Sequence, residues 1–416
     1  MEVKPGYKQT EVGVIPEDWK LTILSALSAF ITKGSTPTTY GFKWESSGVI
    51  FLRSECVAET GLDLSQSMFI SDTAHASLRR STIKEGDLLV TITGYVGRVV
   101  VFRGMEDANI NQHIARVRIN SPLACGRFVY HYLSLPQVKS RFNAITTGQA
   151  YPQISLKQVR DADVPLPPTK AEQEAIAEAL SDADALIESL GQLLAKKRQL
   201  KKGAMQELLR PKPSDEVRLL GDVSSLKGRI GWQGLKQTEF TTYDDEPFLI
   251  TGMNFKDGAI RWGEVYHISE ARYGMAPEIQ LRPNDVLMTK DGTIGKVLYI
   301  DTIPYPGRAS LNSHLLLFRP IVGGYNPRYL YYQLGSRRFK DFIELSKSGT
   351  TFFGLSQASV AAYPVLLPPM AEQIRIAMLL SDMDTEIAVL ESRLTKARHL
   401  KQGMMQELLT GRIRLI

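Results

Sequence analysis

The sequence predicts an α+β protein with two pseudo-symmetric α/β domains joined by two long helices. Three observations support this fold class: a length of 416 residues, an internal repeat at a spacing of two hundred residues, and a heptad pattern in both copies of the repeat. A chain of this length exceeds one ordinary hydrophobic core and suits two domains with connecting structure.

The repeat is the strongest feature of the sequence, and self-similarity of this kind marks a duplicated architecture. When residues 171–209 are shifted by two hundred positions they align with residues 371–409 without a gap, and 22 of the 39 positions are identical. Both copies end with the run Met-Gln-Glu-Leu-Leu. A gapless match of this length indicates a spacer element of fixed length.

Each copy of the repeat is predicted to be a helix with an apolar a/d seam. The seam alternates steps of four and three residues over about three heptads, which favours a coiled coil. Its positions are Ile176, Leu180, Ala183, Ile187, Leu190 and Leu194 in the first copy, and Ile376, Leu380, Met383, Ile387, Leu390, Leu394 and Ala397 in the second. Two seams in one chain most simply pair with each other. The alternative, two amphipathic helices in one ordinary core, leaves the fixed offset unexplained.

The segments that precede the helices correspond more loosely. Gly-Asp-Leu-Leu at 86–89 matches Asn-Asp-Val-Leu at 284–287, and short β-rich runs such as 87–93, 98–102, 113–119 and 297–300 are separated by Gly and Pro. Aromatic-rich stretches at 128–133 and 329–334 are expected to begin helices. The chain therefore divides into a first domain at 1–165, a first long helix at 166–213, a second domain at 214–365 and a second long helix at 366–416.

The composition fits a globular protein, with 43% hydrophobic and 23% charged residues. No stretch approaches eighteen uninterrupted apolar residues, and Met1 to Lys20 lacks the apolar core of a signal peptide, so we expect a cytoplasmic protein without a membrane partner. Cys56 and Cys125 are far apart, which fits a reducing compartment and lacks the paired spacing of a zinc site.

The net charge of +6 permits nucleic-acid binding without demanding it. The excess is spread thinly, with no basic tail. If DNA is the ligand, affinity has to come from folded surfaces or from a partner that embraces the duplex.

Motifs for catalysis are missing. The run from Gly292 to Lys296 lacks the spacing of a phosphate-binding loop, and we find neither a methyltransferase signature nor a metal-binding set of His and Cys. Asp87 is interpreted as part of a turn before a strand. The pairs Asp182/Asp184 and Asp382/Asp384 point to different helix faces and are interpreted as solvated or capping residues. We expect no catalytic residue and no metal site in this chain.

Several motifs together resemble a known family. They are the opening run from Gly6 to Trp19, the pairs Pro167-Pro168 and Pro368-Pro369 that each precede a Glu-Gln pair, the Gly-Asp-Leu-Leu-Val-Thr stretch at 86–91, and the two Met-Gln-Glu-Leu-Leu runs. In this duplicated order they resemble the specificity subunits of type I restriction–modification systems, and the resemblance covers essentially the whole chain.

The resemblance implies two target-recognition domains that each read one half of a bipartite DNA sequence, and long helices that run antiparallel and set the gap between the halves. It also implies modification subunits that use S-adenosylmethionine to methylate adenine, and a restriction subunit that needs ATP and magnesium for cleavage. The chain itself would be a non-catalytic subunit without a cofactor, which agrees with the missing motifs.

Residues that read DNA are expected to be polar, to lie in loops and to differ between the two domains. Arg and Lys favour guanine edges, whereas Asn and Gln favour adenine. The candidates in the first domain are Thr93, Tyr95, Arg98, Asn111, Gln112, His113, Gln149 and Tyr151. Those in the second domain are Lys290, Asp291, Thr293, Lys296, Asn312, Ser313, His314, Thr351, Phe352 and Phe353. Basic loop positions that suit phosphates are Lys33, Arg53, Lys227 and Arg229.

Other interpretations stay open. Asn111 and His113 have identical counterparts in the second domain and fit structural hydrogen bonding equally well. The pairs Gly94/Gly97 and Gly292/Gly295 are interpreted as tight-turn glycines. For the whole chain, one alternative is a coiled-coil adaptor whose globular domains bind protein, and another is an enzyme of a type that these motifs miss.

Overall fold

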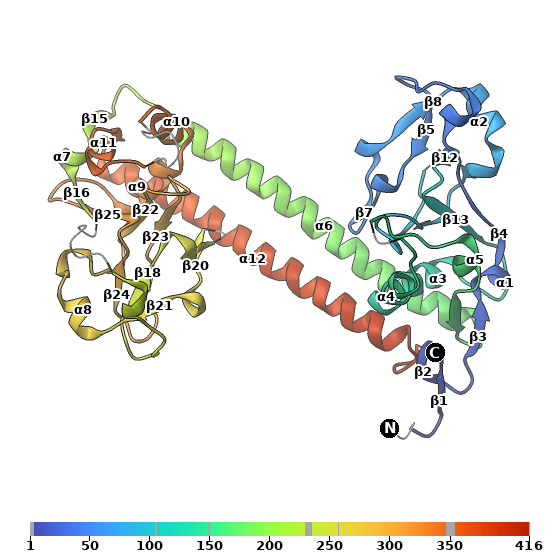
Figure 1. Cartoon of the computed structure of the whole chain (residues 1–416). Coiled ribbons are helices and arrows are strands. Elements are labelled where there is room, and N and C mark those ends of the chain that lie inside the picture. Colours follow the sequence, from blue (N-terminus) through green and yellow to red (C-terminus); the bar gives the residue numbers. More distant parts are fainter. Residues whose placement is uncertain are drawn as a thin grey trace. The chain divides into compact units, whose positions relative to one another are not determined.

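The computed structural model describes residues 4–104, 106–148, 150–228, 235–256, 258–346 and 354–415. The chain forms two compact units: the first comprises Met1–Gly191 and Ser392–Ile416, and the second comprises Gln192–Glu391. Each unit contains one α/β domain, the first part of one long helix and the last part of the other (Figure 1). Within the described residues, every helix is too short or too polar to cross a lipid bilayer.

The first unit contains fourteen described strands and the helices around them. The strands are β1 (Tyr7–Thr10), β2 (Gly13–Pro16), β3 (Lys20–Ile23), β4 (Ser28–Lys33), β5 (Val49–Leu52), β6 (Val57–Ala58), β7 (Gly61–Leu62), β8 (Met68–Ile70), β9 (Thr82–Ile83), β10 (Leu88–Thr91), β11 (Val99–Val101), β12 (Ala108–Ile110), β13 (Ile114–Ile119) and β14 (Asp163–Leu166). The helices are α1 (Leu24–Leu27), α2 (Asp72–Ser77), α3 (Gly126–Leu133), α4 (Pro136–Ala144), α5 (Leu156–Arg160) and the first part of α6 (Lys170–Leu208).

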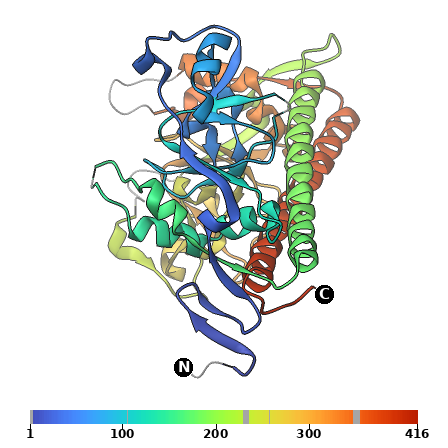
Figure 2. The ribbon, with the colours of Figure 1, turned by 90° about the vertical axis from the view of Figure 1, so that its right-hand side faces the viewer.

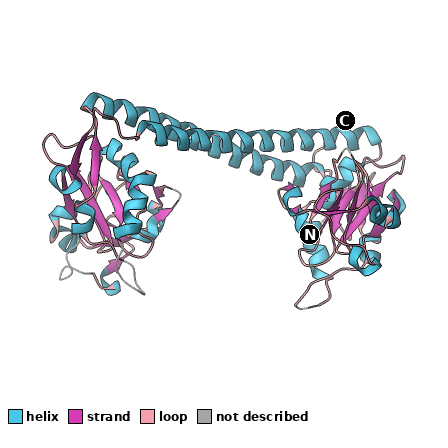
Figure 3. Ribbon diagram, turned by 90° about the horizontal axis from the view of Figure 1, so that it is seen from above, coloured by secondary structure: helices cyan, strands magenta, loops and turns pink. Residues whose placement is uncertain are grey.

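The described part of this domain contains two four-stranded sheets and the two-stranded pairs β1-β2, β3-β14 and β6-β7. Figure 3 distinguishes strands from helices by colour. One four-stranded sheet is antiparallel, in the order β11-β10-β13-β4, with Leu88 opposite Val117. The other has the order β8-β5-β12-β9, and β5 and β12 run parallel. All four residues of β10 are buried, which is why this strand is continuously apolar up to its final threonine.

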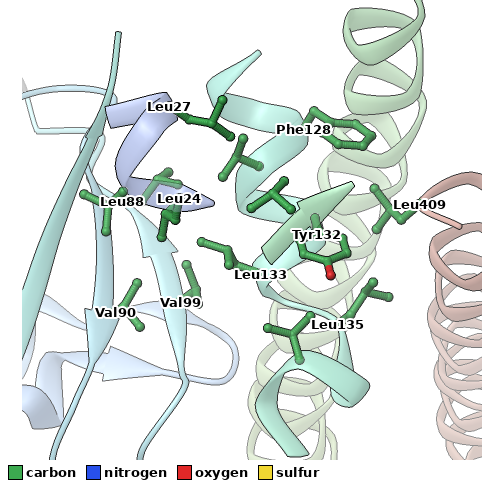
Figure 4. Close-up of a cluster of buried hydrophobic side chains, with 14 of the residues drawn as sticks. Leu24, Leu27, Leu88, Val90, Val99, Phe128, Tyr132, Leu133, Leu135 and Leu409 are labelled. Carbon is green, nitrogen blue, oxygen red and sulfur yellow. The ribbon is translucent and has the colours of Figure 1, made fainter. Parts of the chain in front are cut away.

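The core of the first unit lies between the antiparallel sheet and the helices. Leu88 and Val90 face Leu24, and Phe128 and Leu133 pack from α3 (Figure 4). Leu409, which follows the second long helix α12 (Met370–Leu408), is fully buried in the same cluster. Burying a side chain of this size stabilises the fold by about 1.5–3 kcal/mol. The segment directly after α12 is therefore part of the core of the first unit.

The second unit repeats this plan. Its strands are β15 (Glu216–Leu219), β16 (Ser224–Lys227), β17 (Phe240–Thr241), β18 (Phe248–Ile250), β19 (Phe255–Lys256), β20 (Ala259–Ile260), β21 (Tyr266–Ile268), β22 (Val286–Thr289), β23 (Val297–Tyr299), β24 (Ala309–Leu311), β25 (Leu315–Pro320) and β26 (Pro364–Leu367). Its helices are α7 (Leu220–Val223), α8 (Glu270–Gly274), α9 (Pro327–Gly335), α10 (Arg337–Ser346), α11 (Gln357–Ala361) and the first part of α12. The four-stranded sheets have the orders β16-β25-β22-β23 and β17-β21-β18-β24, with β18 parallel to β24. The predicted duplication of an α/β scaffold is confirmed.

The Gly-Asp-Leu-Leu motif is a turn whose buried aspartate binds a half-buried arginine. Gly86 has a φ of 84°, and its counterpart Asn284 has a φ of 73°. A carboxylate oxygen of Asp87 accepts the Lys84 N–H at 2.8 Å, and the Arg118 guanidinium on β13 donates to both carboxylate oxygens at 2.6 Å. In the second unit Asp285 and Arg319 make the same bidentate pair at 2.7 Å. The predicted turn is confirmed, and the arginine partner was missed because it lies 31 residues away.

The glutamine of the Glu-Gln pair after each Pro-Pro joins a long helix to its domain by side-chain hydrogen bonds. The side-chain oxygen of Gln173 accepts the Cys125 N–H at 2.8 Å, directly before α3, and its amide donates to the Leu123 carbonyl at 2.9 Å. Gln373 accepts the Asn326 N–H at 2.9 Å, directly before α9. Peptide groups at a helix start need such partners because no intrahelical acceptor or donor serves them. The motif is therefore structural in both units.

In each unit two segments of the long helices lie side by side and run in opposite directions (Figures 1 and 2). The predicted seam positions are buried or half-buried, and most intervening positions are exposed. In the first unit Lys401 donates to Asp184 at 2.5 Å, and in the second unit Lys201 pairs with Asp384. The interpretation of Asp184 and Asp384 as solvated or capping residues was therefore wrong. Both are half-buried partners of a lysine on the neighbouring helix.

His131 lies on α3 next to this ion pair of the first unit. Its Nε2 is 3.2 Å from the Ser181 hydroxyl. Burial of the ring, together with the Lys401 ammonium, lowers the pKa of His131 to about 4, against the smaller opposing effect of Asp184. The ring is therefore neutral in the folded protein.

Replacing Asp87 with alanine should destabilise the first unit by about 2 kcal/mol, because the half-buried Arg118 and the Lys84 N–H lose the buried carboxylate that accepts their hydrogen bonds. Urea titrations of wild type and variant measure the difference in the free energy of unfolding of this unit. Asp107→Ala is the matched control, since Asp107 is 3.7 Å from Lys84 in an exposed pair and should cost less than about 1 kcal/mol. Equal effects of the two substitutions would contradict the assignment.

The neutral state of His131 should make stability depend on pH. In the unfolded chain its pKa is about 6.5, so as the pH falls from about 6.5 toward 4 the unfolded state binds a proton that the folded state does not. This contribution to the free energy of unfolding is complete above pH 6.5 and is lost, to the order of 3 kcal/mol, on approaching pH 4. Urea titrations at several pH values should show a smaller loss in His131→Gln, and parallel pH profiles would overturn the expectation.

Candidate nucleic-acid interface

The parallel pairing of β5 with β12 creates the candidate site of the first unit. Parallel strands end at the same edge of a sheet, so Arg53, which follows β5, lies beside Asn111, which follows β12. The Asn111 N–H donates to the Leu52 carbonyl at 3.0 Å. Two segments almost sixty residues apart in sequence therefore meet at one edge.

The antiparallel sheet brings further candidates to this edge. Thr91 at the end of β10 pairs with Ile114 at the start of β13, and the Ile92 N–H donates to the His113 carbonyl at 2.9 Å. Lys33 at the end of β4 pairs with Ala115. The described candidates of this unit are Lys33, Arg53, Thr93, Tyr95, Arg98, Asn111, Gln112, His113 and Tyr151, and we call them the first polar cluster.

Several side chains of the first polar cluster contact one another. The Arg98 guanidinium lies 3.9 Å from the centre of the Tyr95 ring, and Arg98 also donates to the Val57 carbonyl at 3.4 Å. The rings of His113 and Tyr151 meet edge to face with centres 6.2 Å apart. Aromatic and cation–π contacts of this type restrict side-chain freedom before any ligand binds.

Exposure separates two groups within the cluster. Tyr95 and Tyr151 are 65% and 59% exposed, so their rings are available for stacking. Thr93 and Asn111 are buried, and Asn111 accepts the His113 N–H at 3.0 Å through its side-chain oxygen. Asn111 thus has a structural role in the unbound protein, as the alternative interpretation anticipated.

The second unit presents the equivalent edge with other residues. The Asn312 N–H donates to the Ile250 carbonyl at 2.8 Å across the parallel pair β18 and β24, and the Lys290 N–H donates to the His314 carbonyl at 3.0 Å. The imidazole Nδ1 of His314 is 3.1 Å from the Asp291 carboxylate. The described candidates here are Lys227, Lys290, Asp291, Thr293, Lys296, Asn312, Ser313 and His314, and we call them the second polar cluster.

In each unit a threonine hydroxyl closes the loop that contains two glycines, by a hydrogen bond to the residue after the second glycine. We call these loops, residues 92–97 and 290–295, the glycine loops. Thr91 and Thr289 are buried, and their hydroxyls accept the N–H of Arg98 and Lys296, each at 3.0 Å. The intervening glycines at 94, 97, 292 and 295 have φ values of 75°, 81°, 69° and 82°. Their interpretation as tight-turn glycines is confirmed, because this backbone region favours glycine.

Five predicted positions lie outside the described residues: Gln149, Arg229, Thr351, Phe352 and Phe353. Sequence reasoning also missed two turns, Ser54–Cys56 and Gly252–Asn254, that follow β5 and β18 at the two clusters. No sequence signal marks them, because the turns share no residue at equivalent positions.

The two clusters combine basic side chains with polar groups, and the first also exposes aromatic rings. Arg53 and Arg98 in the first cluster and Lys290 and Lys296 in the second can contact phosphates or base edges. Among the described residues, no group of three or more His, Cys, Asp or Glu side chains is placed to hold a metal ion. The arrangement is suited to binding a polyanion with hydrogen-bonding edges.

Known proteins of similar sequence are named as specificity subunits of type I restriction enzymes. The putative type I restriction enzyme MjaX specificity subunit of Methanocaldococcus jannaschii is 24% identical over 436 residues, covering 98% of this chain and 97% of that protein. The type I restriction enzyme EcoBI specificity subunit of Escherichia coli is 26% identical over 204 residues, covering 47% of this chain and 42% of that protein.

Solved structures share the fold. The type I restriction-modification system S subunit from M. genitalium superposes with a TM-score of 0.64 at 16% identity, covering 98% of both chains. A chain from a study of complex assembly and conformational transition of the type I R-M system gives 0.54 at 17% identity, covering 96% of this chain and 99% of that one. The family model of the type I restriction modification DNA specificity domain matches twice, at residues 16–196 and 216–397, and the chain therefore belongs to this family.

Proposed function

We propose that this chain reads a bipartite DNA sequence as the specificity subunit of a type I restriction–modification complex. One observation carries the proposal: equivalent edges of a duplicated scaffold present two polar clusters with different residues. Tyr95 and Arg98 of the first unit stand where the second unit has Thr293 and Lys296. A scaffold used twice with unlike clusters suits two unlike half-sites, because base edges are distinguished by their hydrogen-bonding groups.

We propose that partner subunits supply the chemistry in the cytoplasm. Modification subunits would methylate adenine with S-adenosylmethionine, and a restriction subunit would cleave with ATP and magnesium. The part of α6 in the second unit supports docking of a partner subunit, because Leu193 and Leu200 are seven residues apart and are 41% and 50% exposed. Apolar side chains at such spacing suit a helix of another chain.

The deciding experiment is an exchange of residues 1–165 for the corresponding domain of a relative. The methylated motif, mapped by sequencing modified adenines in cells, should change in one half-site only, because each domain carries its own cluster. Exchange of residues 214–365 should change the other half-site. A change of both half-sites by either exchange would contradict independent reading. Absence of specific binding by the unexchanged complex to a duplex carrying its own motif would favour the protein-binding adaptor.

The purified chain alone should show no methyl transfer, nuclease or ATPase turnover, because its sequence carries no cofactor or phosphate-binding motif. Incubation with S-adenosylmethionine, ATP, magnesium and DNA measures this directly, with the complex of all subunits as the active control. Turnover by the pure chain that disappears on substitution of one of its residues would show that it is an enzyme.

A further inference from the structure

We propose that the two turns missed by sequence reasoning read bases: Glu55 in the first unit accepts a hydrogen bond from a cytosine amino group, and Met253 in the second contacts a thymine methyl group. This inference rests on the proposed function and assigns individual base-reading residues within it. Neither residue was among the predicted candidates.

The two turns are built alike. Ser54–Cys56 and Gly252–Asn254 are single 3-10 turns directly after the parallel strands β5 and β18. Each is closed by the side chain of its last residue: the Arg53 N–H donates to the Cys56 sulfur at 3.4 Å, and the Thr251 N–H donates to the Asn254 side-chain oxygen at 2.8 Å. Because Cys56 and Asn254 are buried, the backbone of both turns is fixed from within.

Each turn lies between the two loops that form its polar cluster. On one side lie the loops that contain Asn111 and Asn312. The N–H of Asn111 donates to the carbonyl of Leu52, the last residue of β5, and the N–H of Asn312 donates to the carbonyl of Ile250, the last residue of β18. On the other side, a β-carbon added to Gly252 would stand 3.2 Å from the methyl carbon of Thr289, the residue that ties the second glycine loop. In the first unit Arg98 of the glycine loop donates to Val57, directly after the turn.

The exposed residues of the two turns differ, whereas the hydrogen bonds that close the turns are equivalent. Met253 is 83% exposed, and Glu55 at the same place in the first turn is also exposed. A residue that reads a base must combine a fixed backbone with a side chain that differs between the halves. Both residues meet this requirement.

The side chains define what each can recognise. In the major groove a carboxylate accepts from the N4 amino group of cytosine, whereas an apolar side chain contacts the C5 methyl group of thymine. The Met253 thioether arm is long and flexible, which lets it reach the groove from a short turn. The second half-site should therefore contain a thymine that is recognised through its methyl group.

The test for Met253 uses uracil, which lacks only that methyl group. Binding of the complex assembled with the full chain is measured on duplexes in which each thymine of the second half-site is replaced in turn. One replacement should weaken binding about fourfold, the value expected for one buried methyl group, and should have no effect on Met253→Ala. Met275→Ala, an exposed methionine at the end of α8, should keep the full uracil effect.

The same uracil effect in wild type and in Met253→Ala, or no effect in wild type, would overturn the assignment. Binding to the first half-site serves as the folding control for the variant. If the wild-type complex bound no specific duplex at all, the proposed function would fail instead, so the two failures are distinguishable.

For Glu55, the methylated motif is mapped in cells that carry Glu55→Gln or the control Glu85→Gln. Glu85 is exposed at the turn before β10, whereas the first polar cluster lies beyond the end of that strand. Glu55→Gln should relax one C·G pair of the first half-site and leave the second half-site unchanged. An unchanged motif, or relaxation at an A·T pair, would contradict the role of Glu55.

Discussion

The parallel pairing of two short strands is the constraint on which the candidate interface depends. In each unit β5 or β18 lies beside a strand that comes much later in the sequence, and both strands end at the same edge. The chain must therefore continue from that edge in two adjacent loops. An antiparallel pair would send these loops to opposite ends of the sheet and would separate Arg53 from Asn111.

Much of the architecture was predictable from the sequence because it is repeated. The gapless copies predicted the two long helices, and the seam from Ile176 to Leu194 identified their inward faces correctly. The side-chain partners were not predictable, because they depend on tertiary contacts. Asp184 was interpreted as solvated, yet it pairs with Lys401, which is 217 residues away.

The candidate site, like the fold, was predictable only in part. The candidate residues were predicted because they are polar, lie in loops and differ between the two domains, and the described ones lie at one edge in each unit. The burial of Thr93 was not foreseen, because a sequence does not show which polar loop residue points inward. The turns at Glu55 and Met253 were missed because their equivalence rests on backbone shape, with a sulfur in one turn and an amide oxygen in the other performing the same bond.

The burial of Leu409 in the core of the first unit has a consequence for synthesis of the chain. The second unit is continuous, from Gln192 to Glu391, so all of its contacts can form as soon as that stretch has left the ribosome. The first unit starts earlier but ends last, since its core also needs Leu408 and Leu409, and its Glu172 pairs with Arg414. Contacts between such distant segments close slowly. The unit translated first is therefore the last to be completed, and until Leu408 and Leu409 have left the ribosome it exposes the apolar surface on which α12 packs.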